Sequence, residues 1–171
     1  MTDLCLYFAY GSNLCTRRLR ERVPSVTFRA AGFVPEHTLR FHKRGRDGSG
    51  KCDCQESAST VDCVWGAIFV LDPAERERLD QAEGLGYGYD EKHVVVQTED
   101  GPIRAFCYVA ARSYIDASLL PYTWYKDFVV MGAGEHHLPE QYVVMIENVE
   151  AQDDPDSTRA ATNRRLLPPD L

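Results

Sequence analysis

The sequence LYFAYGSNL, residues 6–14, joins an apolar and aromatic run to an abrupt polar turn. Residues 4–10 have the composition of a buried strand, and Gly11 ends that strand. Asn13 is well suited to cap a helix that we expect from Leu14 to about Arg22. The stretch therefore predicts a strand, a glycine turn and a helix start in direct succession.

A glycine turn between a strand and a helix can hold an anion. Backbone N–H groups of Tyr10-Gly11-Ser12-Asn13-Leu14 would point into an anion-sized hollow, and the helix N-terminus adds partial positive charge. The turn is not a Walker loop, because no Gly-Lys-Ser/Thr follows, and not a dinucleotide fingerprint, because Gly11 stands alone. Such a hollow suits a carboxylate or one phosphate, although the spacing also fits an ordinary turn.

Strand signals outnumber helix signals in the rest of the chain. Buried or alternating segments predict further strands at residues 26–34, 38–43, 64–71, 93–98 and 103–110. Residues 44–57 are polar and rich in glycine, which indicates a mobile loop. Because neighbouring strands look antiparallel, the pattern favours an α+β fold with a small, curved mixed sheet or barrel.

The segment from Asp72 to Gly84 predicts a helix that ends in a carboxylate. Asp72 can cap it, Pro73 suits its first position, and Glu75 completes a capping box. Gly84 suits the position just past a helix end, which places Glu83 at the C-terminus. A carboxylate there faces negative partial charge, which disfavours its charged form, so Glu83 is a candidate acid/base. A solvent-exposed glutamate of no special role is the alternative.

A chain of 171 residues fits a single domain. We expect a helix from Pro139 through Asn148, and a break at Gly132-Ala133-Gly134 after a mixed segment at residues 122–131. The chain then turns polar. The domain should therefore span residues 1–151, with residues 152–171 as a C-terminal tail that is loosely held or docked.

The charge balance and hydropathy exclude several classes of partner. With a net charge of −7 the chain is a poor generic binder of polyanions, and its basic clusters at residues 17–22 and 42–51 read as a solvated face and a surface loop. The longest apolar run, residues 64–71, is far shorter than the ~20 residues of a membrane helix. The first residues do not resemble a secretory signal. We therefore expect a cytoplasmic protein with no nucleic-acid or membrane partner.

Six scattered cysteines are expected to be free thiols in a reducing compartment. Cys52 and Cys54 are close in sequence, but they lack the two-residue spacing and the second pair of a zinc site. His37 and His42 flank this segment, so a metal or nucleic-acid module stays open as an alternative, although we expect no metal. Cys15 begins the first predicted helix and is an alternative nucleophile, without a recognisable His/Asn context.

Several motifs together resemble the γ-glutamylcyclotransferase family, which includes AIG2-like proteins. The resemblance covers about residues 4–148, most of the chain, and the motifs stand in the family's order. They are residues 6–14, Val64-Trp65-Gly66, Leu79-Asp80-Gln81-Ala82-Glu83-Gly84, Tyr125-Lys126 and Met131-Gly132-Ala133.

This resemblance implies a small mixed β-barrel with short helices and an enzyme that needs no cofactor. Such enzymes release 5-oxoproline and a free amine or amino acid from a small γ-glutamyl amide by intramolecular cyclisation. In the family, the glycine motif holds the glutamyl α-carboxylate, a glutamate before a glycine is the general acid/base, and tyrosines line the pocket. These roles map to Tyr10, Gly11, Ser12, Asn13 and Leu14, to Glu83, and to Tyr89 and Tyr125.

Two related functions stay open at this level. One is a cyclotransferase that removes a γ-glutamyl protecting group during natural-product biosynthesis. The other is a binding module that keeps the fold without turnover, although the presence of Glu83 counts against it. Residues 44–57 match nothing in the family and are a candidate for shaping the site of the leaving amine, so the sequence leaves that amine unidentified.

Overall fold

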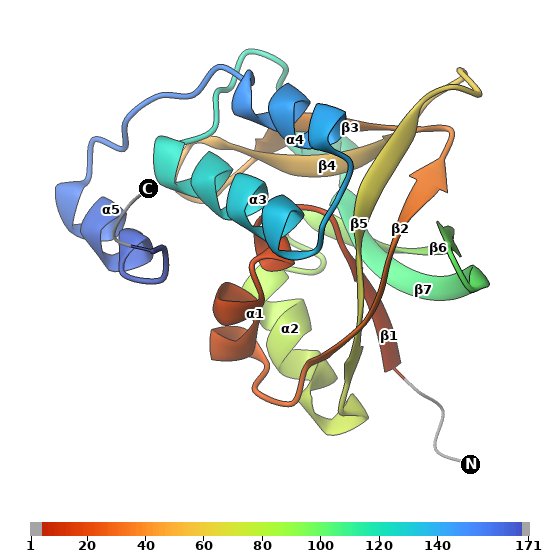
Figure 1. Cartoon of the computed structure of the whole chain (residues 1–171). Helices are drawn as coiled ribbons and strands as arrows, with labels where there is room; N and C mark the ends of the chain where they lie inside the picture. The colour runs from red at the N-terminus through yellow and green to blue at the C-terminus, as the bar shows by residue number, and fades with distance from the viewer. Residues whose placement is uncertain (1–4, 169–171) are drawn as a thin grey trace.

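The computed structural model describes residues 5–168, which are built around a closed barrel of five strands (Figure 1). The strands are β1 Cys5–Ala9, β2 Thr27–Pro35, β5 Cys63–Leu71, β6 Tyr89–Thr98 and β7 Gly101–Ala110. Antiparallel pairing joins β1 to β5, β5 to β2, β2 to β6 and β6 to β7. Parallel pairing of Tyr7 with Phe106 joins β1 to β7 and closes the barrel. The expected α+β fold with a small mixed barrel is confirmed.

Strand β5 explains why its sequence is apolar without alternation. Ala67, Ile68 and Phe69 are consecutive and all buried, so both faces of the strand are covered. A strand that is buried on both faces reads as a continuous apolar run. Phe8 and Phe128 are also fully buried, and they extend the core from the barrel toward the covering helices.

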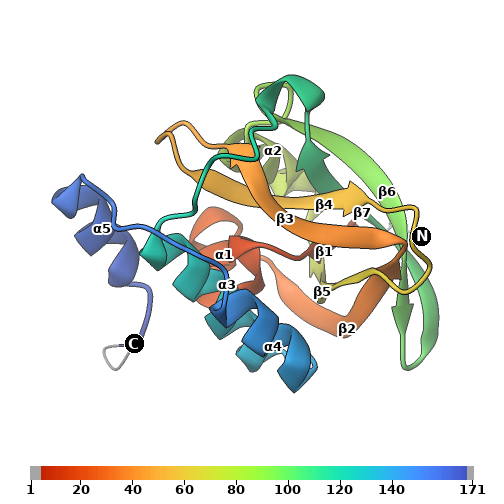
Figure 2. The same cartoon turned by 90° about the horizontal axis from the view of Figure 1, so that it is seen from above.

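Two further strands form a separate sheet across the top of the barrel (Figure 2). They are β3 His37–Arg44 and β4 Gly50–Glu56, paired antiparallel. The expectation of a mobile loop over residues 44–57 is therefore wrong for most of that segment. Asp53 is buried, and its carboxylate accepts hydrogen bonds from His42 Nε2 (2.8 Å) and from Ala110 N (2.7 Å). The buried carboxylate of β4 is satisfied inside the protein, and a composition argument cannot see this.

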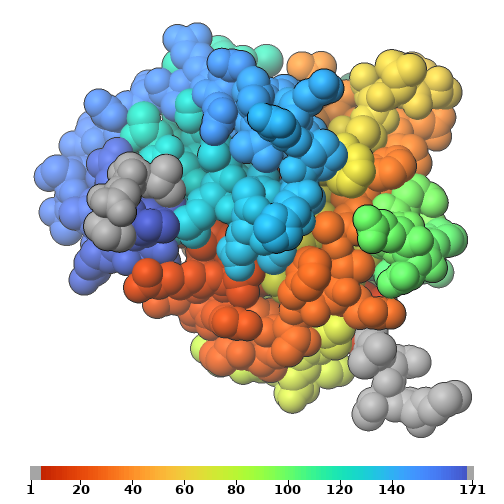
Figure 3. Space-filling view, viewed as in Figure 1, coloured from red at the N-terminus to blue at the C-terminus, as the bar shows by residue number. Residues whose placement is uncertain are grey.

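Residues 5–168 contain five α-helices, of which α5 lies away from the barrel beside α3 (Figure 1). They are α1 Thr16–Arg22, α2 Arg76–Glu83, α3 Thr123–Glu135, α4 Glu140–Glu147 and α5 Ser157–Arg164, with 3₁₀ turns at Ser12–Leu14, Pro73–Glu75 and Arg112–Tyr114. Helices α3 and α4 pack against each other, and they form one continuous face above α1 in the space-filling view (Figure 3). No helix in this part of the chain is long and apolar enough to cross a membrane.

Helix α3 continues through Gly132, so the expected break at residues 132–134 is wrong. Gly132 is buried where the helix crosses the turn after β1. A Cβ atom at this position would lie 2.3 Å from the carbonyl carbon of Leu14 and 2.5 Å from Cys15 N. The glycine is needed for this close approach of two backbones rather than to end the helix.

The start of α2 differs from the predicted capping box. Asp72 caps the 3₁₀ turn Pro73–Glu75 that leads into α2, because its carboxylate accepts a hydrogen bond from Ala74 N at 2.9 Å. The Glu75 carboxylate instead accepts from Ser25 N (2.9 Å), and the backbone N–H of Asp72 donates to Ser25 Oγ (3.0 Å). In a capping box the Glu75 carboxylate would accept from the backbone N–H of Asp72. Here Ser25 stands between the two residues, because it accepts from Asp72 and donates to Glu75. These bonds tie the helix start to the segment before β2.

The C-terminal segment contains helix α5 and contacts α1 and α3. Asp154 accepts hydrogen bonds from Trp124 Nε1 (2.9 Å) and from the Arg159 guanidinium. Arg18 Nη1 donates to Asn163 Oδ1 at 2.9 Å. These side chains link α5 and the residues before it to the helical side of the barrel.

Candidate active site

The turn after β1 is shaped by close packing at Gly11. A Cβ atom there would lie 2.9 Å from Cys52 Cβ and 3.3 Å from the Tyr125 hydroxyl oxygen. The turn then forms the 3₁₀ helix Ser12–Leu14, in which Leu14 N donates to Gly11 O at 3.0 Å. Only glycine allows β4 and α3 to approach the turn this closely.

Backbone N–H groups of this turn lack a partner in the described protein. Leu14 N and Cys15 N donate to the carbonyls of Gly11 and Ser12, at 3.0 and 3.3 Å. The N–H groups of Ser12 and Asn13 begin the 3₁₀ helix, and among residues 5–168 they have no acceptor. Free N–H groups at a helix start can bind an anion.

Asn13 does not cap a helix, so that prediction is wrong. Helix α1 begins at Thr16, and the residue before it provides no side-chain cap. The Asn13 side chain is buried and its amide nitrogen donates to Tyr7 Oη (3.0 Å) and to Glu83 Oε1 (2.8 Å). Its carbonyl oxygen accepts from Arg22 Nη1 at 3.0 Å. Asn13 therefore connects the turn to the acidic group instead of stabilising a helix end.

Glu83 lies at the C-terminus of α2, as the sequence indicated. Gly84 follows it in the left-handed conformation with φ +74°, which ends the helix. The Glu83 carboxylate is 15% exposed and forms an ion pair with Arg22 Nη1 at 2.5 Å. The sequence argument missed Arg22, because nothing in the sequence shows that the end of α1 meets the end of α2. The ion pair counters the unfavourable position of a carboxylate at a helix C-terminus.

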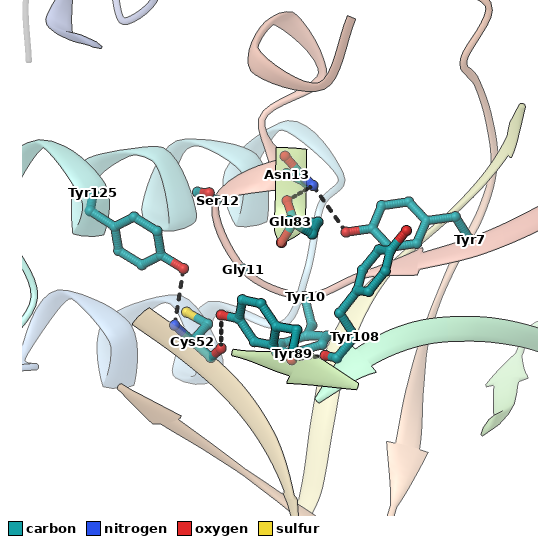
Figure 4. A pocket seen from close by; sticks show the side chains of 10 residues that line it. All are labelled: Tyr7, Tyr10, Gly11, Ser12, Asn13, Cys52, Glu83, Tyr89, Tyr108 and Tyr125. Atoms are coloured by element: carbon teal, nitrogen blue, oxygen red, sulfur yellow. Dashed lines mark hydrogen bonds between the residues drawn. The ribbon is translucent and has the colours of Figure 1, made fainter. Parts of the chain in front are cut away.

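Tyrosine hydroxyls surround the space between the turn and Glu83 (Figure 4). Tyr89 Oη donates to Cys52 O at 2.6 Å, and Cys52 N donates to Tyr125 Oη at 2.9 Å. Tyr10 Oη donates to the backbone carbonyl of Tyr108. Burial raises the pKa of Tyr10, Tyr89 and Tyr125 well above the ordinary value, so all three stay neutral at physiological pH.

The result is a pocket of about 280 Å³ at the mouth of the barrel. It is lined by Tyr7, Tyr10, Gly11, Ser12, Asn13, Cys52, Glu83, Tyr89, Tyr108 and Tyr125. The structure thus brings together seven of the eight residues singled out from sequence. Leu14 is fully buried beneath the turn and does not line the pocket. Sequence reasoning missed Tyr7, Cys52 and Tyr108, although the buried-strand pattern of residues 4–10 places Tyr7 beside the turn.

The cysteine alternatives find little support in the geometry. Burial raises the pKa of the Cys52 thiol to about 12 and also raises the pKa of Cys15. A thiol needs its thiolate form to act as a nucleophile, so both are poorly suited to covalent catalysis. His42, the histidine closest to Cys52 in sequence, is paired with Asp53. Within residues 5–168, no group of three or more His, Cys, Asp or Glu side chains is arranged to hold a metal ion.

Comparisons with known proteins agree with this fold. The AIG2-like family model matches residues 63–146. The γ-glutamylcyclotransferases of Bos taurus and Homo sapiens are each 32% identical to this chain over 157 residues, which covers 86% of the chain and 80% of each relative. A solved structure titled γ-glutamyl cyclotransferase superposes with a TM-score of 0.83 at 26% identity, and covers 95% of this chain and 99% of its own.

The closed mixed barrel, together with the γ-glutamylcyclotransferases that match most of the chain, identifies this protein as an enzyme of the cyclotransferase type. The chain belongs to the γ-glutamylcyclotransferase family.

Proposed function

We propose that this protein releases 5-oxoproline and a free amine from γ-glutamyl amides by intramolecular cyclisation, with Glu83 as the general acid/base. The observation that carries the proposal is the 2.8 Å hydrogen bond between Asn13 Nδ2 and the Glu83 carboxylate. It places the acidic group beside the turn whose free N–H groups suit a carboxylate. One end of a γ-glutamyl group can therefore be held while its other end faces Glu83.

The turn orients the substrate. The glutamyl α-carboxylate would accept hydrogen bonds from the N–H groups of Ser12 and Asn13, which have no acceptor among the described residues. Holding that end folds the glutamyl chain, so that its α-amine approaches its own γ-carbonyl carbon. Orientation of an intramolecular reaction can supply about 7–11 kcal/mol of the barrier.

Glu83 moves the proton. An α-amino group with a pKa of about 8 is mostly protonated at neutral pH, so it must lose a proton before it can attack. Glu83 accepts that proton. The amine nitrogen then bonds to the γ-carbonyl carbon, Glu83 returns the proton to the leaving nitrogen, and the bond from that carbon to the leaving nitrogen breaks. The ring nitrogen gives its second proton to the Glu83 carboxylate, which passes it to the released amine, so that Glu83 ends as it began. No water is consumed, and positioned proton transfer of this kind contributes about 10²–10⁴-fold.

Tyr7 is a suitable donor to the oxygen that becomes negative during ring closure. Its hydroxyl accepts a hydrogen bond from Asn13 Nδ2 at 3.0 Å, which leaves its own proton for a ligand oxygen. Burial raises the pKa of Tyr7 well above the ordinary value, so this proton is retained. A neutral donor in a buried pocket stabilises a developing oxyanion.

The test is release of 5-oxoproline from a panel of γ-glutamyl amides by the wild type and by Glu83→Gln. We expect kcat to fall about 10²–10⁴-fold, because the amide cannot accept a proton. Loss of the charge on one side of the Arg22 pair should lower the unfolding midpoint by about 2–8 °C. Glu77→Gln is the matched control, since Glu77 lies exposed on the same helix outside the pocket.

Two outcomes would contradict the proposal in different ways. Full turnover by folded Glu83→Gln would remove Glu83 from the mechanism. Binding of the γ-glutamyl amides by the wild type without any 5-oxoproline would instead indicate a binding module that has lost catalysis.

A further inference from the structure

A second hollow of about 740 Å³ adjoins the pocket, and its walls are strongly basic. It shares Ser12, Glu83, Tyr89 and Tyr125 with the pocket, so the two spaces are continuous. We call it the basic vestibule, after the five cationic side chains that line it: Arg18, Arg22, Lys43, Arg46 and Lys51. Among its described lining residues only Asp47 and Glu83 are carboxylates, so the vestibule carries three net positive charges in a chain whose net charge is −7.

Two of these five cations already have anionic partners. Arg22 pairs with Glu83, and Lys51 Nζ lies 2.7 Å from the Asp47 carboxylate. The Arg18 guanidinium is bound by neutral side-chain oxygens at 3.2 and 2.9 Å. The vestibule therefore keeps positive charge that the described protein does not neutralise.

Lys43 is the clearest case of an unneutralised cation. Lys43 is only 6% exposed, yet no carboxylate of residues 5–168 forms an ion pair with its ammonium group. Its ammonium instead lies 4.2 Å from the centroid of the Tyr89 ring, on the wall of the pocket. Burying a cation without an anionic partner is costly, and a bound anion would offset that cost.

Arg46 supplies a second such cation in the lining of the vestibule. It lies in the connection between β3 and β4, and within the described residues it has no carboxylate partner. A Cβ atom at Gly84 would lie 3.7 Å from Arg46 Nη2, so the guanidinium reaches the end of α2 beside Glu83. Lys43 and Arg46 thus lie near the group that protonates the leaving nitrogen.

We propose that the basic vestibule binds the leaving amine and selects γ-glutamyl amides whose amine carries two carboxylates, with Lys43 and Arg46 as the residues that determine this specificity. The inference rests on the proposed cyclotransferase function. Two cations that form no ion pair within the described residues match two carboxylates, whereas one α-carboxylate leaves one cation unpaired. Neutral amines gain nothing from the vestibule, and the vestibule repels cationic amines such as amino sugars.

The test compares three substrates that share the γ-glutamyl group. γ-Glutamyl-glutamate has a dicarboxylate leaving group, γ-glutamyl-glutamine is its near-isostere with one carboxylate, and γ-glutamyl-ethylamide has none. For the wild type we expect kcat/KM on the glutamate substrate to exceed that on the glutamine substrate about tenfold, which is the size of one charge-assisted hydrogen bond. Raising the ionic strength should reduce this ratio.

The variants assign the preference to particular residues. Lys43→Met keeps the apolar stem of the buried side chain, and Arg46→Gln changes an exposed residue that carries little folding risk. Each should reduce the ratio to about threefold or less, with a larger loss on γ-glutamyl-glutamate than on γ-glutamyl-ethylamide. Arg44→Gln is the matched control, because Arg44 belongs to the same hairpin but pairs with Asp116 and does not line the vestibule.

The outcomes separate this inference from the proposed function. Equal kcat/KM on the glutamate and glutamine substrates would overturn the dicarboxylate preference while leaving the cyclotransferase function standing. A preference that persists in both Lys43→Met and Arg46→Gln would overturn the assignment to these residues. Equal losses on all three substrates would show that the cations hold the glutamyl group itself. Absence of 5-oxoproline from every substrate would overturn both proposals.

Discussion

Adding one methyl group at Gly132 should damage the active-site turn without touching any proposed catalytic group. The Cβ atom of Gly132→Ala would lie 2.3 Å from the Leu14 carbonyl carbon, whereas ordinary contacts begin at 3.4 Å. Two of the three clashing atoms belong to the backbone and the third is the Leu14 Cβ, which the backbone fixes, so no side chain can rotate away. Either α3 or the turn must therefore move by about 1 Å.

The two effects of the substitution on stability oppose each other. Alanine is better than glycine inside a helix by about 1 kcal/mol. Overpacking of a close backbone contact costs about 1–3 kcal/mol, so the net effect should be a loss. A displacement of about 1 Å in a substrate-orienting group can reduce the rate about 10²-fold. We therefore expect a large fall in kcat/KM for 5-oxoproline release, about 10²-fold, together with only a small fall in the unfolding midpoint.

Gly134→Ala is an internal control in the same helix. Gly134 is exposed, and a Cβ atom there would meet nothing within 4 Å. This variant should gain up to about 1 kcal/mol, raise the unfolding midpoint by about 2–4 °C and keep the wild-type kcat/KM. Wild-type activity and stability in Gly132→Ala, or equal losses in both variants, would refute the packing argument.

Three further outcomes follow from single contacts. Tyr125→Phe removes the acceptor of the buried Cys52 N–H (2.9 Å), so urea unfolding should show a loss of about 1–3 kcal/mol; an unchanged midpoint would contradict this. Burial lowers the pKa of His136, which donates to Leu14 O, below its ordinary 6.5, so the unfolded chain binds more protons as pH falls. The contribution of neutral His136 to the free energy of unfolding is therefore complete above pH 6.5 and is lost as pH falls through the lowered pKa. The unfolding midpoint of His136→Gln should accordingly vary less between pH 7 and pH 5 than that of the wild type. Gly84→Ala, at φ +74°, should cost about 1–2 kcal/mol in thermal unfolding, and a stabilised variant would argue against the left-handed helix end.

Local patterns predicted the barrel strands because each is a short apolar or alternating segment with a turn signal at its end. The same logic placed Glu83 at a helix end, since Asp72 and Gly84 mark both limits of that segment. The wrong predictions share one cause, which is a contact with residues that are distant in the sequence. Strand β4 reads as a loop because its buried Asp53 finds partners on β3 and β7, which are distant in sequence.

The candidate site shows the same division. The glycine turn and Glu83 are visible in the sequence as single motifs. Their connection is not, because it depends on Asn13 turning its side chain toward Glu83 and on Arg22 reaching across from α1. The positive charge of the vestibule was hidden for a related reason. A cluster at residues 42–51 reads as a surface loop until β3 and β4 are seen to bring Lys43 to the pocket wall.

A structure of the protein with bound 5-oxoproline tests the central claim most directly. We predict that the 5-oxoproline carboxylate accepts hydrogen bonds from the Ser12 and Asn13 N–H groups at about 2.7–3.2 Å, with its ring facing the Glu83 carboxylate. A ring bound away from this turn, with Glu83 directed into bulk water, would contradict the account.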